Sequence, residues 1–347
     1  MGWNNEPLVA SPGIVVGRKG TVGAINWSST PFWAIDTTYY VIPNPGIDMR
    51  WCYWLLTLIN LSKLDSSTGV PGLNRNDAYA ERVLVPSEPE QRRIAEILDA
   101  ADEAIRKTDD LIAKLKMMKR GLLHDLLTRG VDEDGRLREG NTEIGVKRPG
   151  TKEIPISEAA KLDPPVNFHR VGVYDLVSFV PMVDVTEDAL WDKRRTRVFS
   201  EVRSGYTPFQ EGDVLFAKIT PCMENGKVCF AENLRNGVGF GSTEFYVLRA
   251  NEGIEPRFLL YWLQTEAVRL RAQAFMIGSA GQQRVKPDFF ASFTINVPTE
   301  TEQRIIIEIL QTHDARIRAE EAYRDKLKMI KKGLMHDLLT GRVRVKV

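Results

Sequence analysis

The chain has 347 residues, of which 43% are hydrophobic and 27% charged, and its formal net charge at pH 7 is +1. These values are ordinary for a globular protein, and the length suits two domains. A net charge near zero excludes binding of nucleic acid through a global positive field, so such binding would use local basic patches or a partner.

Cysteine, histidine and hydropathy patterns exclude further classes. The three cysteines, Cys52, Cys222 and Cys229, are odd in number and irregularly spaced, which argues against a disulfide framework. Together with four scattered histidines they offer no credible zinc set. No apolar run approaches the roughly 20 residues of a membrane span, and the N-terminus lacks a signal-peptide pattern. We therefore expect a reduced, cytoplasmic protein without a metal site.

The first predicted unit, residues 1–85, mixes β-type runs with a helical one. The β-type runs are GIVVGRKGTVGAI at 13–25 and TTYYVI at 37–42, and residues 47–56 are expected to be helical. This mixture predicts an α+β domain with a small twisted sheet. As argued below, we expect it to be a partial domain.

A long helix is predicted next, over residues 86–128. Ser87 and Glu90 have the spacing of a capping box, in which the hydroxyl accepts from a free N–H of the first turn and the carboxylate reaches back to the cap's own N–H. Apolar residues then recur at two heptad positions, as in a coiled coil. The positions of this seam are Ile94, Leu98, Ala101, Ile105, Thr108, Ile112, Leu115, Leu122 and Leu126.

Residues 129–165 are rich in glycine, proline and charge, which predicts a linker. Within it, residues 132–143 resemble a calcium-binding loop, but arginines occupy two ligand places, so we expect a solvated turn. A second globular domain is expected over 166–297, because β-type runs such as VLFAKI, EFYVL and FTINVP alternate there with helical ones. The predicted fold class is therefore α+β in both halves.

A second long helix is predicted over residues 298–341, followed by a tail at 342–347. It repeats the first helix, because residues 85–128 align with 297–340 without a gap and about 25 of the 44 positions are identical. Thr299 and Glu302 repeat the capping box. Since weaker similarity extends upstream, each half of the chain is predicted to be a globular domain followed by a helix roughly 60 Å long.

Charge along the predicted helices indicates their mutual orientation. Residues 88–110 carry eight acidic and four basic side chains, whereas residues 111–128 carry one acidic and four basic, and the second helix has the same gradient. Part of this gradient complements the helix dipole. Two such helices attract when antiparallel, because the acidic start of each meets the basic end of the other. We predict an antiparallel coiled coil whose centre is weakened by His313, Glu320 and Arg324.

The two predicted globular domains are unequal. Gly212 is preceded by about 46 residues of its own domain, whereas its repeat partner, Gly13, is preceded by twelve residues. Judged by its own repeat partner, the first domain is therefore expected to lack the N-terminal third.

These features resemble the specificity (S) subunit of type I restriction–modification systems. The resemblance is carried by EQRRIAEIL and EQRIIIEIL, by KLKxxKxGLxHDLLT in both helices, by TRGVDEDGRLREGNTEIG, and by GDVLFAKITPCMENGKV followed by GSTEFYVL. It covers almost the whole chain from Gly13 onward. It implies two target recognition domains that each read half of a split DNA sequence, and two antiparallel helices that separate them and dock methyltransferase (M) subunits.

The resemblance also implies a non-catalytic subunit that directs adenine methylation and, through restriction (R) subunits, cleavage. It implies no cofactor on this chain, because S-adenosylmethionine, ATP and magnesium would belong to partner subunits. One alternative is a coiled-coil interaction protein that binds M subunits but reads one half-site or none. A stand-alone nuclease or methyltransferase is least favoured, because DPPV at 163–166 departs from the methyltransferase motif at its fourth residue and no P-loop is present.

Base reading requires polar or basic side chains on loops that reach a groove. In the second domain we predict such loops at DKRRTR (192–197), KITPCMENGK (218–227) and SAGQQRVK (279–286). The candidate residues are Arg194, Arg195, Arg197, Lys218, Thr220, Asn225, Lys227, Gln282, Gln283 and Arg284, and, at roughly corresponding places in the first domain, Arg18, Lys19, Asn74 and Arg75. For each of them, a solvated charge or a polar loop is the competing interpretation.

The helix ends supply candidate partner-binding residues. His124–Asp125 and His336–Asp337 look like a repeated catalytic pair, but adjacent helical residues diverge by about 100° and no nucleophile recurs nearby. We therefore predict a structural or M-docking role. The predicted docking residues are Lys116, Lys119, His124, Asp125, Lys328, Lys331, His336 and Asp337.

Overall fold

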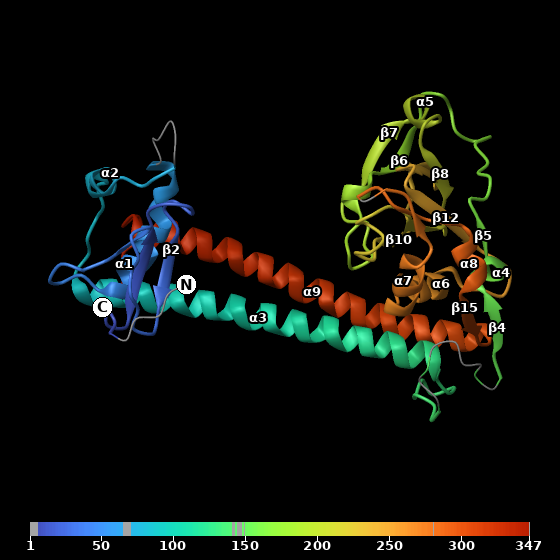
Figure 1. The fold of residues 1–347 in the computed structure, drawn as a ribbon, viewed down its shortest axis with the longest axis horizontal. Helices are drawn as coiled ribbons and strands as arrows, with labels where there is room; N and C mark the ends of the chain where they lie inside the picture. The colour runs from blue at the N-terminus through green and yellow to red at the C-terminus, as the bar shows by residue number, and fades with distance from the viewer. Residues whose placement is uncertain are drawn as a thin grey trace. The chain divides into compact units, whose positions relative to one another are not determined.

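The structure is a computed structural model of the chain, which describes residues 6–64, 71–140, 143, 148, 150–279 and 281–346. It divides into two compact units: unit 1 comprises Met1–Ala113 and Arg318–Val347, and unit 2 comprises Lys114–Ile317. Two long helices, α3 (Glu88–Thr128) and α9 (Glu300–Leu339), each contribute to both units (Figure 1). Each unit therefore contains the start of one long helix and the end of the other.

The predicted antiparallel packing of the long helices is confirmed in each unit. In unit 1, Leu98 near the start of α3 belongs to the same buried cluster as Leu338 at the end of α9. In unit 2, Leu126 at the end of α3 shares a buried cluster with Leu310 near the start of α9. Leu98 and Leu126 occupy predicted seam positions, and Leu310 and Leu338 are the repeat-related residues of the second helix, so the heptad pattern identified the packed face correctly.

Unit 1 contains one small sheet and a helix that packs on it. The elements are β1 (Gly13–Gly17), β2 (Ile25–Ser28), β3 (Thr38–Tyr40), α1 (Met49–Ile59), the 3-10 turn η1 (Leu61–Leu64) and α2 (Arg75–Ala80), with antiparallel strand order β2-β1-β3. Asp48 caps α1 by accepting a hydrogen bond from the Trp51 amide at 2.8 Å, and Asn60 ends α1 in the left-handed conformation.

The core of unit 1 joins α1 to the two long helices. Trp51 and Trp54 of α1 are almost fully buried, and they share a cluster with Ile94 and Leu98 of α3 and with Leu338 of α9. Each buried aromatic side chain of this size removes roughly 150–250 Å² from water. The small domain therefore obtains apolar burial from the long helices, in addition to a second cluster around Ile14 and Val16 of its own sheet.

Unit 2 contains a larger α+β domain with two four-stranded sheets, ordered β10-β9-β12-β5 and β7-β6-β11-β8 (Figure 1). Its elements are β4 (Lys152–Pro155), α4 (Ile156–Ala159), β5 (Ala160–Leu162), β6 (Leu176–Val180), η2 (Met182–Asp184), β7 (Arg195–Val198), α5 (Phe199–Val202), β8 (Thr207–Gln210), β9 (Val214–Ala217), β10 (Val228–Phe230), η3 (Arg235–Gly237), β11 (Val238–Gly241), β12 (Phe245–Ala250), α6 (Pro256–Leu263), α7 (Glu266–Gln273), β13 (Met276–Ile277), β14 (Arg284–Val285), α8 (Asp288–Ser292) and β15 (Thr294–Val297).

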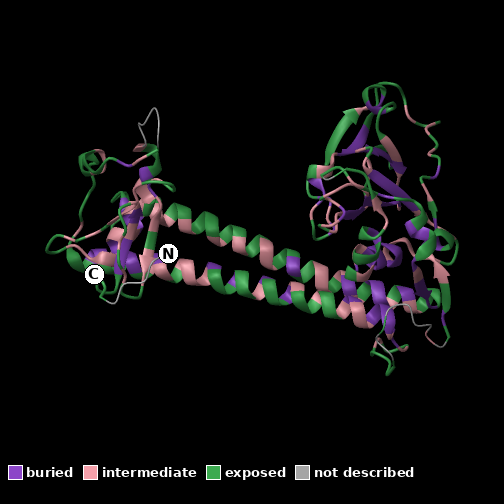
Figure 2. Ribbon diagram, in the orientation of Figure 1, coloured by how far each residue is buried: buried purple, intermediate pink, exposed green. Residues whose placement is uncertain are grey.

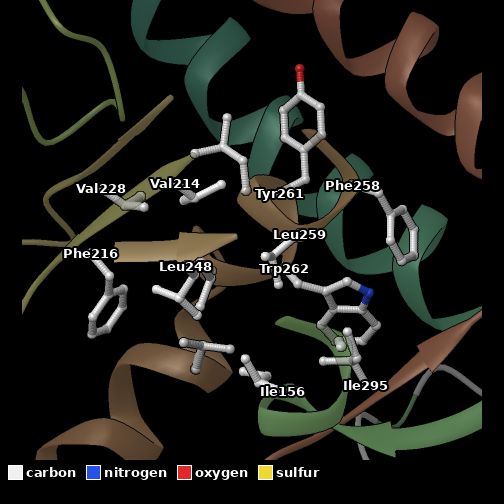
Figure 3. Packing of buried hydrophobic residues seen from close by; sticks show 14 of the residues in the cluster. Ile156, Val214, Phe216, Val228, Leu248, Phe258, Leu259, Tyr261, Trp262 and Ile295 are labelled. Atoms are coloured by element: carbon white, nitrogen blue, oxygen red, sulfur yellow. The ribbon is translucent and has the colours of Figure 1, made fainter. Parts of the chain in front are cut away.

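The main core of unit 2 lies between α6, the first sheet and the long helices. Trp262 and Leu259 of α6 are fully buried, and Figure 3 shows them among Leu248, Ile156 and Ile295. Figure 2 shows buried residues in most strands of the two sheets of unit 2, with the exposed edge strand β7 as an exception, whereas buried and exposed residues alternate along the long helices. This alternation is what an amphipathic helix with one packed face produces.

The predicted linker at 129–165 needs correction at its C-terminal part. Strand β4 pairs with β15, and β5 pairs with the edge of β12, so residues 152–162 belong to the domain of unit 2. The composition was misleading because these edge strands are very short and contain Pro155 and charged side chains, which sheet edges tolerate. The stretches 141–142 and 144–147 and residue 149 lie outside the described residues.

The predicted inequality of the two domains is visible in their sheets. Gly17 pairs with Thr38 in unit 1 as Ala217 pairs with Phe245 in unit 2, so β2-β1-β3 corresponds to β10-β9-β12. Among the described residues of unit 1 there is no counterpart of the second sheet, which consists of β6, β7, β8 and β11. Unit 1 thus repeats the half of the domain nearest to the long helices.

The predicted capping box of the second long helix is correct in one of its two hydrogen bonds. At the start of α9, the Thr299 hydroxyl accepts from the Glu302 amide at 3.3 Å, as expected. The Glu302 carboxylate instead accepts from the Val131 amide at 2.9 Å and forms a 2.8 Å ion pair with Arg148. This carboxylate therefore ties the start of α9 to the segment that follows the end of α3.

The same tie recurs in unit 1. The Glu90 carboxylate accepts from the Arg344 guanidinium at 2.8 Å and from the Val345 amide at 3.1 Å. Glu90 is buried, and Arg344 lowers its pKa, with the Val345 amide adding to the effect. The start of each long helix is thus fixed to the chain just beyond the end of the other helix.

Candidate nucleic-acid interface

Two predicted reading loops, residues 218–227 and 279–286, lie side by side in unit 2. The Thr220 amide donates to the Gln283 carbonyl at 3.0 Å, and the Gln283 amide donates to the Thr220 hydroxyl at 3.1 Å. The Val285 amide donates to the Lys218 carbonyl at 2.9 Å. Segments 63 residues apart in sequence therefore form one polar surface.

Lys218 and Lys227 lie at this surface, and the ammonium group of each has a contact within the domain. The Lys218 ammonium lies 4.8 Å from the centroid of the Tyr246 ring, whose hydroxyl donates to the Val285 carbonyl at 2.8 Å. The Lys227 ammonium donates to the Met182 carbonyl at 3.2 Å. Because an ammonium has three donors, both lysines keep donors that can contact a phosphate.

Arg284, predicted to read a base or a phosphate, forms an ion pair within the domain. Its guanidinium donates to both carboxylate oxygens of Glu244, at 2.9 and 2.7 Å. This ion pair lowers the pKa of Glu244, so the carboxylate stays charged at neutral pH. The Nε edge of the guanidinium is thereby used to hold the loop beside the residue that precedes β12, while its Nη1 group is not part of this pair and base or phosphate contact by Arg284 stays a prediction.

Two arginines of the basic cluster at 192–197 also form contacts within the domain. Arg195 forms a two-pronged ion pair with the buried Asp184, with one of its distances at 2.8 Å. The Arg194 guanidinium lies 4.2 Å from the Trp191 ring and donates to the Glu232 carbonyl at 2.9 Å. Arg195 thus has a structural role, because its removal would leave Asp184 buried without its partner, and its contact with phosphate stays a prediction.

Arg197 remains a candidate for phosphate contact. It is exposed on β7, and its guanidinium lies 5.2 Å from the Phe179 ring. The turn η2 connects this strand to the reading loops, because Asp184 holds Arg195 and the neighbouring Met182 carbonyl holds Lys227. The three segments predicted from sequence thus meet in one region of unit 2.

The uncharged candidates fall into two groups. Gln282 and Asn225 are exposed, whereas Gln283 and Thr220 are partly buried where the loops join. The sequence analysis missed Arg269 of α7, which lies close enough to Gly226 that a Cβ there would come within 3.4 Å of its guanidinium. The sequence did not indicate this proximity, because α7 lies near the reading loops only in the folded domain.

Unit 1 repeats the joining of loops on a smaller scale. The Leu73 amide donates to the Arg18 carbonyl at 2.9 Å, just as Val285 donates to Lys218 in unit 2. Lys19 forms a β-bridge with Gly72. The predicted correspondence between these places in the two domains is therefore present in the backbone.

Two of the unit 1 candidates have local structural roles. Asn74 is the N-cap of α2, where its Oδ1 accepts from the Asn76 amide at 2.9 Å, and base reading by its exposed side chain stays a prediction. Arg18 donates to the Asp36 carbonyl at 3.2 Å. Arg75 lies 6.0 Å from the Tyr79 ring and, with Lys19, remains a prediction.

Two predicted docking lysines are used inside the coiled coil. Lys119 lies 2.6 Å from Asp314, and the two side chains are 13% and 17% exposed. Lys331, at the repeat-related position, pairs with Asp102 and lies 4.4 Å from the Trp54 ring. The prediction of a partner contact is corrected for both lysines. These pairs also confirm that acidic starts meet basic ends.

The remaining docking candidates stay predictions. Lys116 pairs with Asp188 at 2.6 Å, and Lys328 and His336 are exposed. His124, Asp125 and Asp337 are partly buried.

Exposed apolar side chains on the helices were missed by the sequence analysis. Met117 and Met118 on α3 are 62% and 53% exposed, and the repeat-related Met329 and Ile330 on α9 are 70% and 46% exposed. The M-M and M-I pairs stand within the KLKxxK motifs, where they were treated as part of a helix end. Their recurrence at equivalent positions is the signal that could have revealed them.

Other chemistry finds little support in the described part of the chain. No group of three or more His, Cys, Asp or Glu side chains there could hold a metal ion, and no helix there is long and apolar enough to span a membrane. Burial raises the pKa of the Cys52 thiol to about 11 and that of Cys229 to about 12, which leaves both unreactive. Asp163 of the DPPV run accepts from the Val247 amide at 2.8 Å, a structural role.

The comparisons with known proteins agree with one another on the kind of protein to which the chain is similar. The family model described as "Type I restriction modification DNA specificity domain" matches residues 1–117 and 178–329. Over 231 residues the chain is 32% identical to the type I restriction enzyme EcoEI specificity subunit of Escherichia coli, covering 65% of this chain and 35% of that protein. Over 309 residues it is 24% identical to the MjaVIII specificity subunit of Methanocaldococcus jannaschii, covering 82% and 68%.

The matched region is thus only about a third of EcoEI, and it is 23% of the E. coli EcoAI specificity subunit, which is 38% identical over 138 residues. Among solved structures, a chain from work on assembly and conformational transition of the type I R-M system aligns with a TM-score of 0.58 at 16% identity, covering 97% of this chain and 85% of that one. The S subunit from M. genitalium aligns with a TM-score of 0.55 at 15% identity and the same coverages. These two likenesses show a shared fold.

Proposed function

The chain belongs to the family of type I restriction modification DNA specificity domain proteins, and from this premise we propose that it is the DNA-recognition subunit of a type I restriction–modification complex. In this role it reads a bipartite target in double-stranded DNA and directs adenine methylation and, with R subunits, cleavage. It acts in the cytoplasm and catalyses no reaction itself. S-adenosylmethionine, ATP and magnesium would serve its partner subunits.

The observation that carries this proposal is the joining of three polar segments of unit 2 into one region. The loops 218–227 and 279–286 are hydrogen-bonded to each other, and η2 connects them to β7. Arg284 and Arg195 hold the loops through ion pairs with Glu244 and Asp184. Loops that are fixed before binding lose less conformational entropy on the DNA, which favours a reading surface.

The exposed and partly exposed side chains of this region suit two tasks. Lys218, Lys227 and Arg197 present positive charge and suit phosphate oxygens, which fix the position of the protein on the duplex. Gln282 and Asn225 are exposed amides, and such amides can pair with the N6 and N7 groups of adenine in the major groove. Phosphate contacts would supply affinity, and the amides would supply sequence preference.

We further propose that M subunits dock on α3 and α9. The exposed pairs Met117–Met118 and Met329–Ile330 offer apolar area beside basic side chains, which is typical of a protein–protein contact. Because the two patches are related by the repeat, they suit two copies of one partner. Methionine side chains adapt to different surfaces, which favours such a role.

A second candidate function is a coiled-coil protein that binds M subunits but reads a single half-site. It is favoured by one observation, the lack of a counterpart of the second sheet in the described residues of unit 1. In unit 2 that sheet carries β7 with Arg197 and is connected to the reading loops. Without it, the reading loop of unit 1 has fewer basic groups near it.

Mapping methylated adenines in DNA from cells that express this chain with its M partner tests both candidates. A split motif supports bipartite reading, and a single short motif supports the second candidate. Cells that express the M partner alone are the matched control. Methylation independent of this chain, or identical with and without it, would contradict both.

A further inference from the structure

The ion pair of Arg284 and Glu244 joins two segments of unit 2 whose backbones are fixed. Arg284 lies on β14, where it pairs with Ile277 of β13 on one side and forms a β-bridge with Ile219 on the other. The Glu244 carbonyl accepts from the Lys218 amide at 2.9 Å. The two side chains therefore extend from backbone positions that hydrogen bonds already hold.

The contacts of the guanidinium define which of its edges is left for a ligand. Its Nε and Nη2 groups donate to the Glu244 carboxylate at 2.9 and 2.7 Å. A guanidinium has five N–H donors and this pair uses two of them, so the pair leaves both donors of Nη1 and one of Nη2. The Arg284 side chain is 46% exposed. The end of the guanidinium away from Nε can therefore meet a ligand while the ion pair stays intact.

The charges of the pair favour a base over a phosphate as this ligand. Arg284 holds the pKa of the Glu244 carboxyl below its usual 4.5, so the carboxylate is charged at neutral pH. Its charge offsets much of the attraction between the guanidinium and a phosphate, but it does not change the direction of the remaining N–H groups. Lys218 and Lys227 already supply positive charge for phosphates at the same surface.

Guanine offers the acceptors that this edge requires. Its O6 and N7 atoms lie side by side in the major groove, and a two-donor contact to them is the commonest base-specific contact of arginine. The neighbouring Gln282, and Asn225 on the adjoining loop, are exposed amides of the kind that suits adenine. Arg284 therefore lies in a region that already contains groups suited to base edges.

We propose that Arg284 reads a guanine in the half-site bound by unit 2, and that Glu244 is a positioning residue that orients the guanidinium before DNA binds. This inference rests on the proposed function and adds the identity of one base and the residues that select it. A freely rotating arginine side chain loses rotamer freedom when it binds a base, which opposes binding. Because Glu244 fixes the side chain in advance, less of that freedom is lost on the DNA.

The competing interpretation is that the ion pair only stabilises the loop. Ion pairs between partly exposed side chains contribute little to stability. The loops are also joined without it, because Thr220 and Gln283 exchange hydrogen bonds of 3.0 and 3.1 Å. The two interpretations differ in one measurable respect, since only a positioning role makes the preference for a single base depend on Glu244.

Selection of bound sequences from random duplexes, with the complex of this chain and its M subunits, locates the guanine. The wild-type motif is expected to contain a guanine whose preference is lost in Arg284→Met, a variant of similar length without donors. At that position 7-deazaguanine, which lacks the N7 acceptor, should weaken wild-type binding about fivefold to tenfold. The same replacement should weaken binding of Arg284→Met by less than about twofold.

Glu244→Ala tests the positioning role. It removes a negative charge, so binding to duplexes without the motif should strengthen by roughly twofold to fivefold. At the same time, the preference for guanine over 7-deazaguanine should fall to about twofold. Glu266→Ala is the matched control, because Glu266 is also a carboxylate beside an arginine, 3.6 Å from Arg269. This control should leave the preference for guanine at its wild-type value.

The inference is overturned if no guanine of the motif depends on Arg284, if 7-deazaguanine weakens the wild type and Arg284→Met equally, or if Glu244→Ala keeps the full preference for guanine. Each of these results leaves the proposed function standing, because the chain still selects a motif. Selection of no motif by the wild-type complex would instead contradict the proposed function, and this inference with it.

Discussion

The two units share the contacts that join each domain to the long helices, and they differ in the strands that surround those contacts. In both, a buried glutamine accepts from the N-cap residue of the preceding domain helix, with the Asp48 amide donating to Gln91 and the Glu255 amide donating to Gln303, each at 2.8 Å. In both, a glutamate at the helix start binds the chain beyond the other helix. Unit 2 adds a second sheet and a paired β15.

This difference teaches which part of the domain the sequence repeat preserves. The repeated residues are those that join each domain to the long helices, whereas the reading loops differ in length and charge between units. A protein that must hold a constant scaffold and present variable loops is expected to divide its sequence in this way.

The largest expected effect is a core truncation that compares the two units directly. Trp262 in unit 2 is fully buried, and the residue at its place in unit 1 is Leu55, which is 7% exposed. Trp262→Ala should lower the free energy of unfolding of unit 2 by about 3–5 kcal/mol, and Leu55→Ala should lower that of unit 1 by about 2–3 kcal/mol. Hydrogen exchange resolved by unit measures both, because the units need not unfold together.

The ion pairs of the coiled coil offer the second comparison. Lys119→Met removes the partner of a carboxylate that is 17% exposed, whereas Lys331→Met removes the partner of Asp102, which is 48% exposed. Lys119→Met should lower the free energy of unfolding by about 2–3 kcal/mol. Lys331→Met should lower it by about 1 kcal/mol or less, because solvent stabilises the charge of Asp102.

Denaturation with guanidinium chloride measures these two costs. The double variant Lys119→Met with Asp314→Leu should recover most of the loss, because no charge is then left unpaired. Equal losses of unfolding free energy in Lys119→Met and Lys331→Met would contradict the expectation that the more buried ion pair contributes more.

DNA binding provides the third comparison, between Lys218 and Arg18. Lys218→Ala should weaken duplex binding by the complex with M subunits about fivefold to tenfold and lower the slope of binding against salt by about one unit, because one phosphate contact is lost. Arg18→Ala should change affinity by less than about twofold, since its guanidinium already donates to the Asp36 carbonyl. Fluorescence anisotropy at several salt concentrations measures both, with Lys63→Ala as the charge control.

The smallest expected effect concerns pH and the tie at Glu90. Its pKa lies below the usual 4.5, so the tie contributes stability above the pKa of the unfolded chain and loses it as pH falls through the lower folded value. The Val345 amide should therefore keep its chemical shift at neutral pH and move in acid, below pH 4.5. In Glu90→Gln this acid transition should vanish; its persistence would assign it to another carboxylate.

Much of the scaffold could be predicted from sequence, because it depends on local and periodic signals. The seam positions and the opposed charge gradients are repeated patterns, and they identified the antiparallel helices correctly. The ties made by Glu90 and Glu302 were not predictable, since their partners are 254 and 171 residues away. A capping-box spacing describes the local alternative, which the tertiary contact replaced.

The candidate site was predictable in its segments but not in its individual residues. Polar density and turn signals identified the loops 218–227 and 279–286, which do come together. The engagement of Arg284 with Glu244 and of Arg195 with Asp184 could not be read from composition, because a surface arginine and a bracing arginine look alike in sequence. Strand β4 was missed for the related reason that its partner, β15, is far away in the chain.

Selection of bound sequences from random duplexes, using the complex of this chain with its M subunits, tests the central claim most directly. The wild-type chain is predicted to select a discrete motif, and Gln282→Ala is predicted to relax preference at one or two positions while the complex stays assembled. Selection of no motif, or an unchanged motif in variants of Gln282, Gln283 and Asn225 alike, would contradict the assignment of DNA reading to this surface of unit 2.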